Sequence, residues 1–385
     1  MNRPTILLLL LSVWLTAGCV EPLEHEAPRL YLRIELPEDP VTKGEVGSEA
    51  AWTAERTLKN LHVWVFRNDN GALIDYKKFS ENDLALMKTG MSDRWYIELS
   101  GSKAAIATEK PNVDVYALAN AGTAGTGLNF NNTTTRAQLK DALMGVGAFG
   151  TANPMIDNSI SSNGVPYSGV GTDLPISGDY PMLELEPVTL VRTVSKITFL
   201  FCQVCVDDED KTLVDDFQIG TVTFPGYQIC NKEYVFNDTR ITGTSLHVDA
   251  DPTNNNDYQE APISFENPVL ARNPFPEKYT YRSASHSTES AAEYAARIRQ
   301  AVEDGLLTRR VYYLRESNKQ LAGSFSYKIA DGDWTDRTFS MGAAGDFARN
   351  HDWVVYVYFL ADEILFRVSW VQWEQGGVLY LTPEN

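Results

Sequence analysis

The chain has 385 residues and a formal net charge of −18, and it is long enough for two domains of about 180 residues each. Its hydrophobic content of 43%, with 18 Tyr, 16 Phe and 8 Trp, favours well-packed cores over disorder. A surface this acidic argues against nucleic-acid binding and against electrostatic attachment to anionic membranes.

The chain opens with a secretory leader over residues 1–18. Arg3 precedes an apolar run at residues 6–11, and small residues at 16–18 lead to Cys19. This arrangement is typical of a signal peptide and is too short for a retained membrane helix. Small residues directly before a cysteine resemble a bacterial lipobox, which implies that Cys19 carries the lipid anchor of the mature protein.

Residues 19–28 are acidic and lack a core pattern, so we expect a solvated tether. An acidic stretch after the lipid cysteine also resembles the surface-export signal of Bacteroidetes lipoproteins, with a plain spacer as the alternative. The next segment, residues 29–36, alternates strictly. It places four apolar side chains on one face of a half-buried strand, namely Leu30, Leu32, Ile34 and Leu36.

The rest of the first half is rich in strand patterns. Strands are expected at residues 61–66, 73–74, 94–99, 112–118, 182–186 and 190–206, with a turn at residues 67–71. Thr135 can cap a helix over residues 136–144, with Leu139 and Leu143 on one face. The composition of residues 145–178, rich in Gly, Ser, Asn and Pro, predicts a long irregular loop.

The second half follows an acidic loop at residues 207–210. Strands are expected at residues 218–224, 233–236, 310–314, 323–329, 354–359 and 364–371, with a polar loop at residues 251–257. One helix is expected over residues 288–304, closed by Gly305. Short strands with few helices predict a mainly β chain of two tandem β-sandwich domains, residues 29–206 and 207–385.

Patterns of catalysis or metal binding are weak. Cys202 and Cys205 have C-x-x-C spacing, but residues three apart in a strand point to opposite faces, and no further Cys pair or nearby His completes a zinc set. A buried free thiol and a disulfide with Cys230 stay open as alternatives. No G-x-S-x-G, P-loop or H-E-x-x-H motif is present. We therefore expect no enzyme activity, cofactor or metal.

Five segments occur in an order that resembles the fimbrillin family, the subunits of Bacteroidetes type V pili. They are the hairpin at residues 61–73, the strand ending in Ala119-Asn120-Ala121, residues 174–178, the strand at residues 190–197, and residues 349–353 before an aromatic strand. The resemblance implies transthyretin-like sandwich domains and a structural subunit, of stem or tip and accessory type, that supports adhesion. It further implies an outer-membrane lipoprotein that later becomes part of a fimbrium on the cell surface. The partners it implies are other fimbrial subunits and a ligand on a host or bacterial surface.

The resemblance also implies assembly by strand exchange. A protease would remove the first strand, residues 29–43, and a C-terminal segment of another subunit would replace it. Lys43 in the polar linker stands where the family usually has Arg, and Arg56 is the alternative cleavage site. Cleavage at neither residue, with a permanent first strand, is a further alternative.

At the other end of the chain, Gly376 and Gly377 precede an apolar terminal strand that contains Val378 and Tyr380. This strand could be donated to a neighbour or could fold back as an edge strand. The competing function is a surface lipoprotein that does not polymerise and binds polysaccharide through exposed aromatic residues such as Trp52, Trp95 or Trp334.

Overall fold

A computed structural model describes most of the chain. The described residues are 27–35, 57–88, 95–120, 130–144, 164–203, 217–230, 233–236, 251, 253–270, 300, 308–329, 331–359 and 364–372. Among them, no helix has the length and apolar character needed to cross a membrane. The helix expected over residues 288–304 lies outside this part of the chain.

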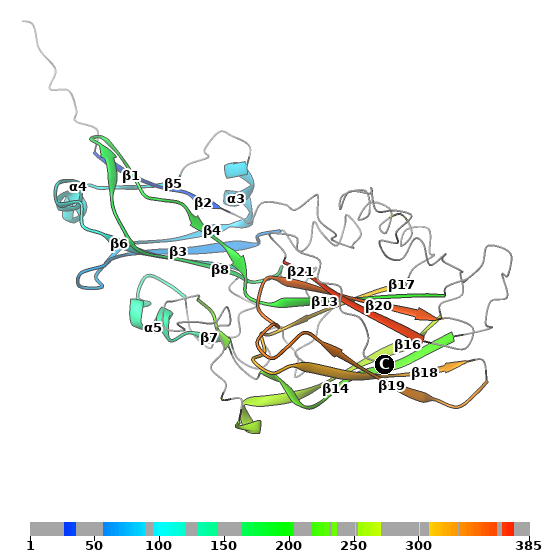
Figure 1. Ribbon diagram of the computed structural model, residues 1–385. Helices are drawn as coiled ribbons and strands as arrows, with labels where there is room; N and C mark the ends of the chain where they lie inside the picture. Colours follow the sequence, from blue (N-terminus) through cyan, green and yellow to red (C-terminus); the bar gives the residue numbers. More distant parts are fainter. Residues whose placement is uncertain are drawn as a thin grey trace, which may run out of the picture.

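The N-terminal group of strands forms three sheets (Figure 1). Their orders are β12-β8-β6-β3-β4, β5-β1-β10-β9 and β11-β2. The bounds are β1 Arg29–Leu32, β2 Ile34–Glu35, β3 Asn60–Arg67, β4 Leu73–Ser80, β5 Trp95–Glu98, β6 Val113–Ala119, β8 Tyr167–Leu174, β9 Ser177–Asp179, β10 Met182–Glu184, β11 Val188–Thr189 and β12 Val191–Arg192. Figure 1 shows the β1 sheet lying over the five-stranded sheet.

The C-terminal group contains two four-stranded sheets that face each other (Figure 1). Their orders are β17-β13-β20-β21 and β16-β14-β18-β19. The bounds are β13 Ser195–Gln203, β14 Phe217–Cys230, β16 Tyr258–Leu270, β17 Thr308–Leu314, β18 Leu321–Ile329, β19 Thr335–Met341, β20 His351–Phe359 and β21 Ile364–Gln372. Two groups of packed sheets confirm the predicted mainly β fold with β-sandwich domains.

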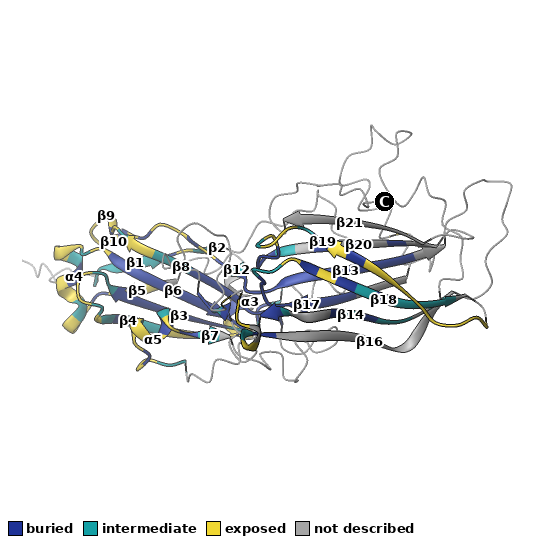
Figure 2. Cartoon of the chain, turned by 60° about the horizontal axis from the view of Figure 1, so that its bottom comes forward, coloured by how far each residue is buried: buried dark blue, intermediate teal, exposed yellow. Residues whose placement is uncertain are grey.

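Each group has its own apolar core (Figure 2). The N-terminal core contains Trp64 and Tyr116, and the C-terminal core contains Phe199, Phe325 and Trp353. Side chains that alternate along each strand supply these residues, because one face of each sheet points inward. Val311 and Tyr313 of β17 nevertheless pack in the N-terminal core, so the two cores meet at the junction between the groups.

One small sheet crosses that junction. β7 (Leu143–Met144) pairs antiparallel with β15 (Glu233–Tyr234), which follows β14 of the C-terminal group. The domain boundary that we expect after residue 206 stays a prediction. The pairing of β13 with β17 and β20 favours a boundary just before Ser195 at the level of the sheets.

Helices are short in the described residues. They are α3 Glu81–Lys88, the 3-10 helix η1 Gly101–Lys103, α4 Ala104–Glu109, α5 Arg136–Lys140 and the 3-10 helix η3 Asn255–Asp257. Thr135 caps α5 as predicted, and its hydroxyl accepts from the Gln138 amide in a capping box. The predicted extent of this helix was wrong, because the chain leaves the helix after Lys140 and Leu143 joins β7 instead.

The predicted loop over residues 145–178 was wrong in its last part. β8 (Tyr167–Leu174) is a strand between β12 and β6, although its sequence contains Gly169 and Gly171. The segment 190–206, predicted as one strand, is interrupted between β12 and β13. β16 and the largely exposed β19 were not predicted.

Candidate functional site

The first strand lies in the middle of its sheet. β1 pairs antiparallel with β5 on one side and parallel with β10 on the other. Leu30 is therefore opposite both Ile97 and Leu183. β2 continues the segment and pairs in parallel with β11. Residues 29–35, which we call the first-strand segment, thus fill a slot between strands that come much later in the chain.

Backbone hydrogen bonds hold both edges of the first-strand segment. The Arg29 amide donates to the Pro181 carbonyl (2.8 Å), and the Leu99 amide donates to the Pro28 carbonyl (2.7 Å). Further along, the carbonyls of Tyr31 and Arg33 accept from the amides of Leu185 and Val188 at 3.0 and 2.9 Å. All four are backbone interactions, so any strand of suitable shape could supply the same donors and acceptors.

The inner face of the first-strand segment is apolar and buried. Leu30 is 0% exposed and Leu32 is 3% exposed, while Ile34 packs partly buried against the same core. Their neighbours from β5, β10 and the adjoining turns are also buried, namely Ile97, Leu99, Leu183, Leu185 and Val188. The predicted division of the segment into an apolar and a polar face is confirmed for these residues.

The outer face carries aromatic and charged side chains. The rings of Tyr31 and Tyr96 are 5.5 Å apart, and the Arg29 guanidinium lies 4.9 Å from the centre of the Tyr96 ring. Tyr96 is exposed. These contacts lie at the protein surface, so their contribution to holding the segment is small beside the burial of the inner face.

A close approach of two backbones supports β11, the neighbour of β2. A Cβ atom on Gly169 of β8 would lie 2.5 Å from the Thr189 carbonyl oxygen and 3.1 Å from the Val188 side chain. Only glycine leaves room for β11 at this position. The glycine-rich sequence that predicted a loop is therefore the reason that β8 can pass beneath the first-strand slot.

The remaining residues of the predicted site lie outside the described part of the chain. They are the lipidation residue Cys19, the apolar residue Leu36, the cleavage candidates Lys43 and Arg56, and the donor-strand residues Val378 and Tyr380. Their roles stay predictions. The structure brings Leu30, Leu32 and Ile34 together in one slot.

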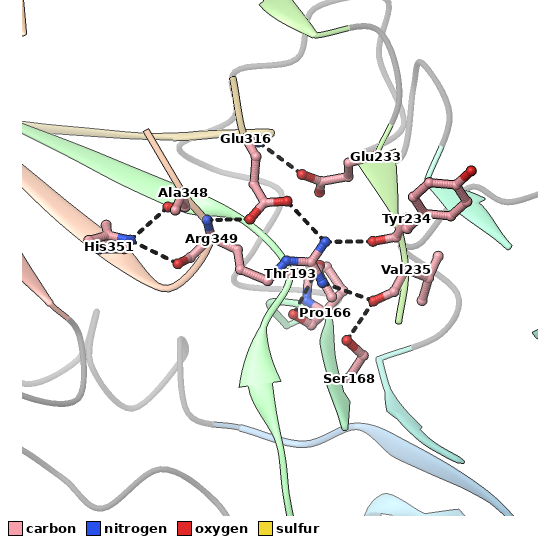
Figure 3. Close-up of polar contacts among 10 residues, drawn as sticks. All are labelled: Pro166, Ser168, Thr193, Glu233, Tyr234, Val235, Glu316, Ala348, Arg349 and His351. Atoms are coloured by element: carbon pink, nitrogen blue, oxygen red, sulfur yellow. Dashed lines mark hydrogen bonds and ion pairs between the residues drawn. The ribbon is translucent and has the colours of Figure 1, made fainter. Parts of the chain in front are cut away.

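A second site joins the two groups of strands (Figure 3). Arg349, which precedes β20, is buried and donates to the carbonyls of Tyr234 (2.5 Å) and Val235 (3.0 Å). Its guanidinium also pairs with Glu316 at 3.1 Å, and Glu316 is fully buried. The Val235 carbonyl accepts from the Ser168 hydroxyl at 2.6 Å. Side chains and backbone of both groups therefore converge on residues 233–236, which we call the junction segment.

The junction segment also fills space in the N-terminal core. The Val235 amide donates to the Ala142 carbonyl at 2.8 Å, and the rings of Phe236 and Tyr116 meet edge to face with centroids 5.2 Å apart. Glu233 accepts from the Glu316 amide at 2.9 Å. Burial, followed by the charge of Glu316, raises the pKa of Glu233 well above its usual range.

Sequence reasoning did not single out Glu233, Glu316 or Arg349 as partners. Residues 190–197 and 349–353 are far apart in the sequence, and they are neighbours in the structure. The Asn350 amide donates to the Val194 carbonyl at 2.8 Å, and β13 pairs in parallel with β20. The signal that could have indicated this contact was Arg192 within the largely apolar run 190–194, because a buried arginine needs acceptors. Its guanidinium donates to the Asn350 side-chain oxygen at 3.4 Å.

The five-stranded sheet contains a buried histidine. His62 of β3 lies 2.9 Å from the Tyr76 hydroxyl and stacks on the Trp64 ring at 5.6 Å. Burial, together with the charge of Lys78, lowers the pKa of His62 to about 4. The imidazole is therefore neutral at physiological pH and belongs to the core.

The described residues contain no group of His, Cys, Asp and Glu side chains that could hold a metal ion. The Cys230 thiol is buried and free, and its burial raises its pKa to about 12. The thiol of Cys230 is thus unreactive at neutral pH. Cys205 lies outside the described residues, and only the backbone of Cys202 is described.

Comparison with known proteins gives one family. Residues 31–182 match the family model described as major fimbrial subunit protein (FimA). No curated protein sequence matches the chain.

Several solved structures have a similar arrangement of strands. A fimbrial assembly protein from Parabacteroides distasonis is 16% identical at a TM-score of 0.46, over 92% of this chain and 99% of that one. A tip fimbrial protein from Porphyromonas gingivalis with a C-terminal truncation is 12% identical at a TM-score of 0.45, and the match covers 90% of this chain and 99% of that one. A fimbrilin from the same organism is 10% identical at a TM-score of 0.44, and the match covers 87% of this chain and 90% of that one.

The family match begins within β1 at Tyr31 and ends at Met182, the first residue of β10. It therefore contains the first-strand segment from Tyr31 onward and the whole of β5. Residues 31–182 of this chain are thus similar in sequence to the major fimbrial subunit proteins of the fimbrillin family.

Proposed function

We propose that the chain is a structural subunit of a bacterial surface fimbria that assembles by protease-triggered strand exchange. In this proposal Cys19 carries the lipid that holds the precursor at the outer membrane. Cleavage at Lys43, or alternatively at Arg56, separates the first-strand segment from the body of the protein. The C-terminal strand of another subunit, with Val378 and Tyr380, then takes its place.

The observation that carries the proposal is the position of β1 between β5 and β10. Burying the inner-face side chains Leu30, Leu32 and Ile34 contributes roughly 5–9 kcal/mol before losses. While the segment is covalently attached, its departure is opposed by this burial and by rapid rebinding. Cleavage removes the attachment, so a competing strand can then replace the segment permanently.

The two paired edges explain why the precursor would stay monomeric. An exposed sheet edge recruits strands from other chains, but both β5 and β10 present their edges to β1 in the intact protein. Loss of the first-strand segment would expose two edges and an apolar floor together. A donated strand with alternating apolar residues could pair with both exposed edges and could cover the apolar floor with its side chains.

A reversible disulfide provides the sharpest test. Tyr31 and Tyr96 lie directly opposite each other, and the Tyr31 carbonyl is directed to β10 instead of β5. In such a non-hydrogen-bonded pair the Cα atoms are about 4.5 Å apart, which suits a disulfide. The double variant Tyr31→Cys/Tyr96→Cys therefore locks the segment in place and can be released by a reductant.

The experiment treats purified full-length protein with trypsin, followed by N-terminal sequencing and size-exclusion chromatography with light scattering. We expect a cut after Lys43 or Arg56 and then a ladder of oligomers. The locked variant should be cut but stay monomeric until it is reduced, while Tyr31→Cys alone behaves as the native protein. A trimmed, unlocked protein that stays monomeric at high concentration would overturn the proposal and favour the non-polymerising polysaccharide-binding lipoprotein.

The cleavage residue is tested separately. Lys43→Gln should abolish trimming by a lysine-specific protease and leave cleavage at Arg56 available to an arginine-specific one. Arg56→Gln is the matched variant. Oligomers that form equally well in both variants would show that either cut suffices, whereas loss in only one identifies the site.

A further inference from the structure

Trp334 is an exposed aromatic residue beside an irregular part of a C-terminal sheet. Its side chain is 48% exposed, just before β19 at the edge of the β16-β14-β18-β19 sheet. The other large exposed hydrophobic residues of the described chain are Tyr96, Tyr180 and Met182, and all three belong to the N-terminal group. Trp334 is therefore isolated from them.

A β-bulge makes room for the Trp334 ring. The pairing of β14 with β18 shifts register between Ile219 and Val222, and Gly220 lies within this irregular stretch. A Cβ atom on Gly220 would lie 2.6 Å from the Ser326 hydroxyl oxygen and 2.9 Å from the far edge of the indole ring, so a side chain at this position would displace both groups. Bulges of this kind re-aim side chains and occur next to functional sites.

Polar side chains surround the ring on the same face of the sheet. The Lys328 ammonium lies over the ring, 5.8 Å from its centroid. Ser326 is paired with Asp336 across β18 and β19, and the Ser326 hydroxyl accepts from the Thr221 amide at 2.9 Å. Asp336 is exposed. A cation, a carboxylate and a hydroxyl thus lie beside one half-exposed indole.

We infer that this surface, formed by Trp334, Lys328, Ser326, Asp336 and the bulge at Gly220, binds a sugar ring of a neutral polysaccharide. The electron-rich face of an indole attracts the weakly positive C–H groups of a pyranose. The neighbouring ammonium and carboxylate can donate to and accept from sugar hydroxyls. The surface therefore suits a ligand that carries many hydroxyl groups next to one apolar face.

Charge selects against the other candidate ligands. The Lys328 ammonium lies beside the ring, but Asp331, Asp333 and Asp336, which are close to Trp334 in the sequence, are exposed. The whole chain carries a formal charge of −18. A polyanion such as a nucleic acid or a sulfated glycan would be repelled. A neutral polymer pays no such penalty, so binding should depend little on ionic strength.

The site goes beyond the proposed function and does not depend on strand exchange, since it lies in the C-terminal sheet and needs no cleavage. Binding can therefore be measured on the uncut monomer. The probes are dextran, mannan and arabinogalactan as neutral polysaccharides and heparin as the anionic one. Retardation in native gels containing each polymer, followed by titration calorimetry, gives the affinities.

We expect at least one neutral polysaccharide to bind, with affinity lowered at least tenfold by Trp334→Ala and less by Trp334→Tyr. Gly220→Ala should also weaken binding, because it displaces the ring while keeping the indole. Tyr180→Ala is the matched control, an exposed aromatic of the N-terminal group, and should bind as the native protein does. Thermal unfolding of each variant separates loss of the site from loss of fold.

Three results would overturn the inference. They are no binding to any neutral polysaccharide, binding that survives Trp334→Ala in a folded protein, and preference for heparin. If Trp334→Ala does not fold, Trp334→Tyr and Lys328→Ala decide the outcome in the same assay. Failure here leaves the cleavage and oligomerisation results untouched, so the two proposals fail separately.

Discussion

Two short segments dock into the N-terminal group of strands, and they are held by different chemistry. The first-strand segment is held by apolar side chains and by backbone pairing on two edges. The junction segment is held by particular polar side chains. Those of Arg349 and Ser168 donate hydrogen bonds to its backbone carbonyls. Both segments are largely buried, so burial alone does not distinguish them.

The difference concerns exchangeability. Apolar side chains and backbone amides are available in any alternating strand, so the contacts in the first-strand slot do not require one particular sequence. A buried arginine paired with a buried glutamate requires one particular arrangement, because a lost partner leaves an uncompensated charge. Under the proposed strand exchange, the first strand is therefore the part that is replaced, and the junction segment is the part that stays in place.

The largest expected effect is at the junction. Arg349→Ala leaves Glu316 buried without its ion pair and removes two hydrogen bonds to the junction segment, so we expect a loss of about 3–5 kcal/mol in the free energy of unfolding. Urea denaturation of the uncut protein measures it. The control Lys59→Ala breaks the exposed pair with Glu81 and should cost less than about 1 kcal/mol. Equal effects of the two variants would contradict the permanent role of the junction.

The next effect tests the apolar slot. Leu30→Ala should lower the free energy of unfolding of the intact protein by about 2–5 kcal/mol, since it removes a fully buried side chain from a packed core. The same substitution should leave the stability of a trimmed, strand-exchanged oligomer unchanged, because residue 30 is then absent. Chemical denaturation of both forms gives the comparison. A cost that persists after exchange would mean that the segment was never replaced.

The third prediction concerns the loss of stability in acid that the buried His62 should cause. Its folded-state pKa of about 4 lies below the ordinary value of 6.5, so the unfolded chain binds a proton that the folded core does not. This contribution is complete above pH 6.5 and is lost as the pH falls towards 4, by up to about 3 kcal/mol. His62→Phe should flatten the stability profile between these pH values. An unchanged slope would show that other groups cause the acid sensitivity.

The smallest effect concerns the support of β2. Gly169→Ala places a methyl group against the Thr189 carbonyl, so we expect a cost of about 1–3 kcal/mol from overpacking and faster proteolytic release of the first-strand segment. Gly171→Ala is the matched variant, since its Cβ meets the flexible Leu174 side chain at 2.6 Å and that side chain can move. Thermal unfolding and trimming rates measure both. A larger cost for Gly171→Ala would contradict this packing argument.

Local patterns predicted much of the fold because they act over a few residues. Alternation over Leu30, Leu32 and Ile34 indicated a strand with one buried face, and Thr135 indicated the start of a helix. The same reasoning failed at β8, where glycines are required by a neighbouring backbone. It also failed after Lys140, where the chain turns to pair with β15, a strand about 90 residues away.

The sequence by itself determined the mainly β character of the chain and the apolar face of residues 30–34. Only the tertiary structure decided that β1 lies between β5 and β10, that Arg349 meets Glu316, and that Trp334 rests on Gly220. The physical reason is that alternation specifies which face of a strand is buried but not which strands lie beside it. Neighbours are chosen by packing and by the pairing of buried charges across the whole chain.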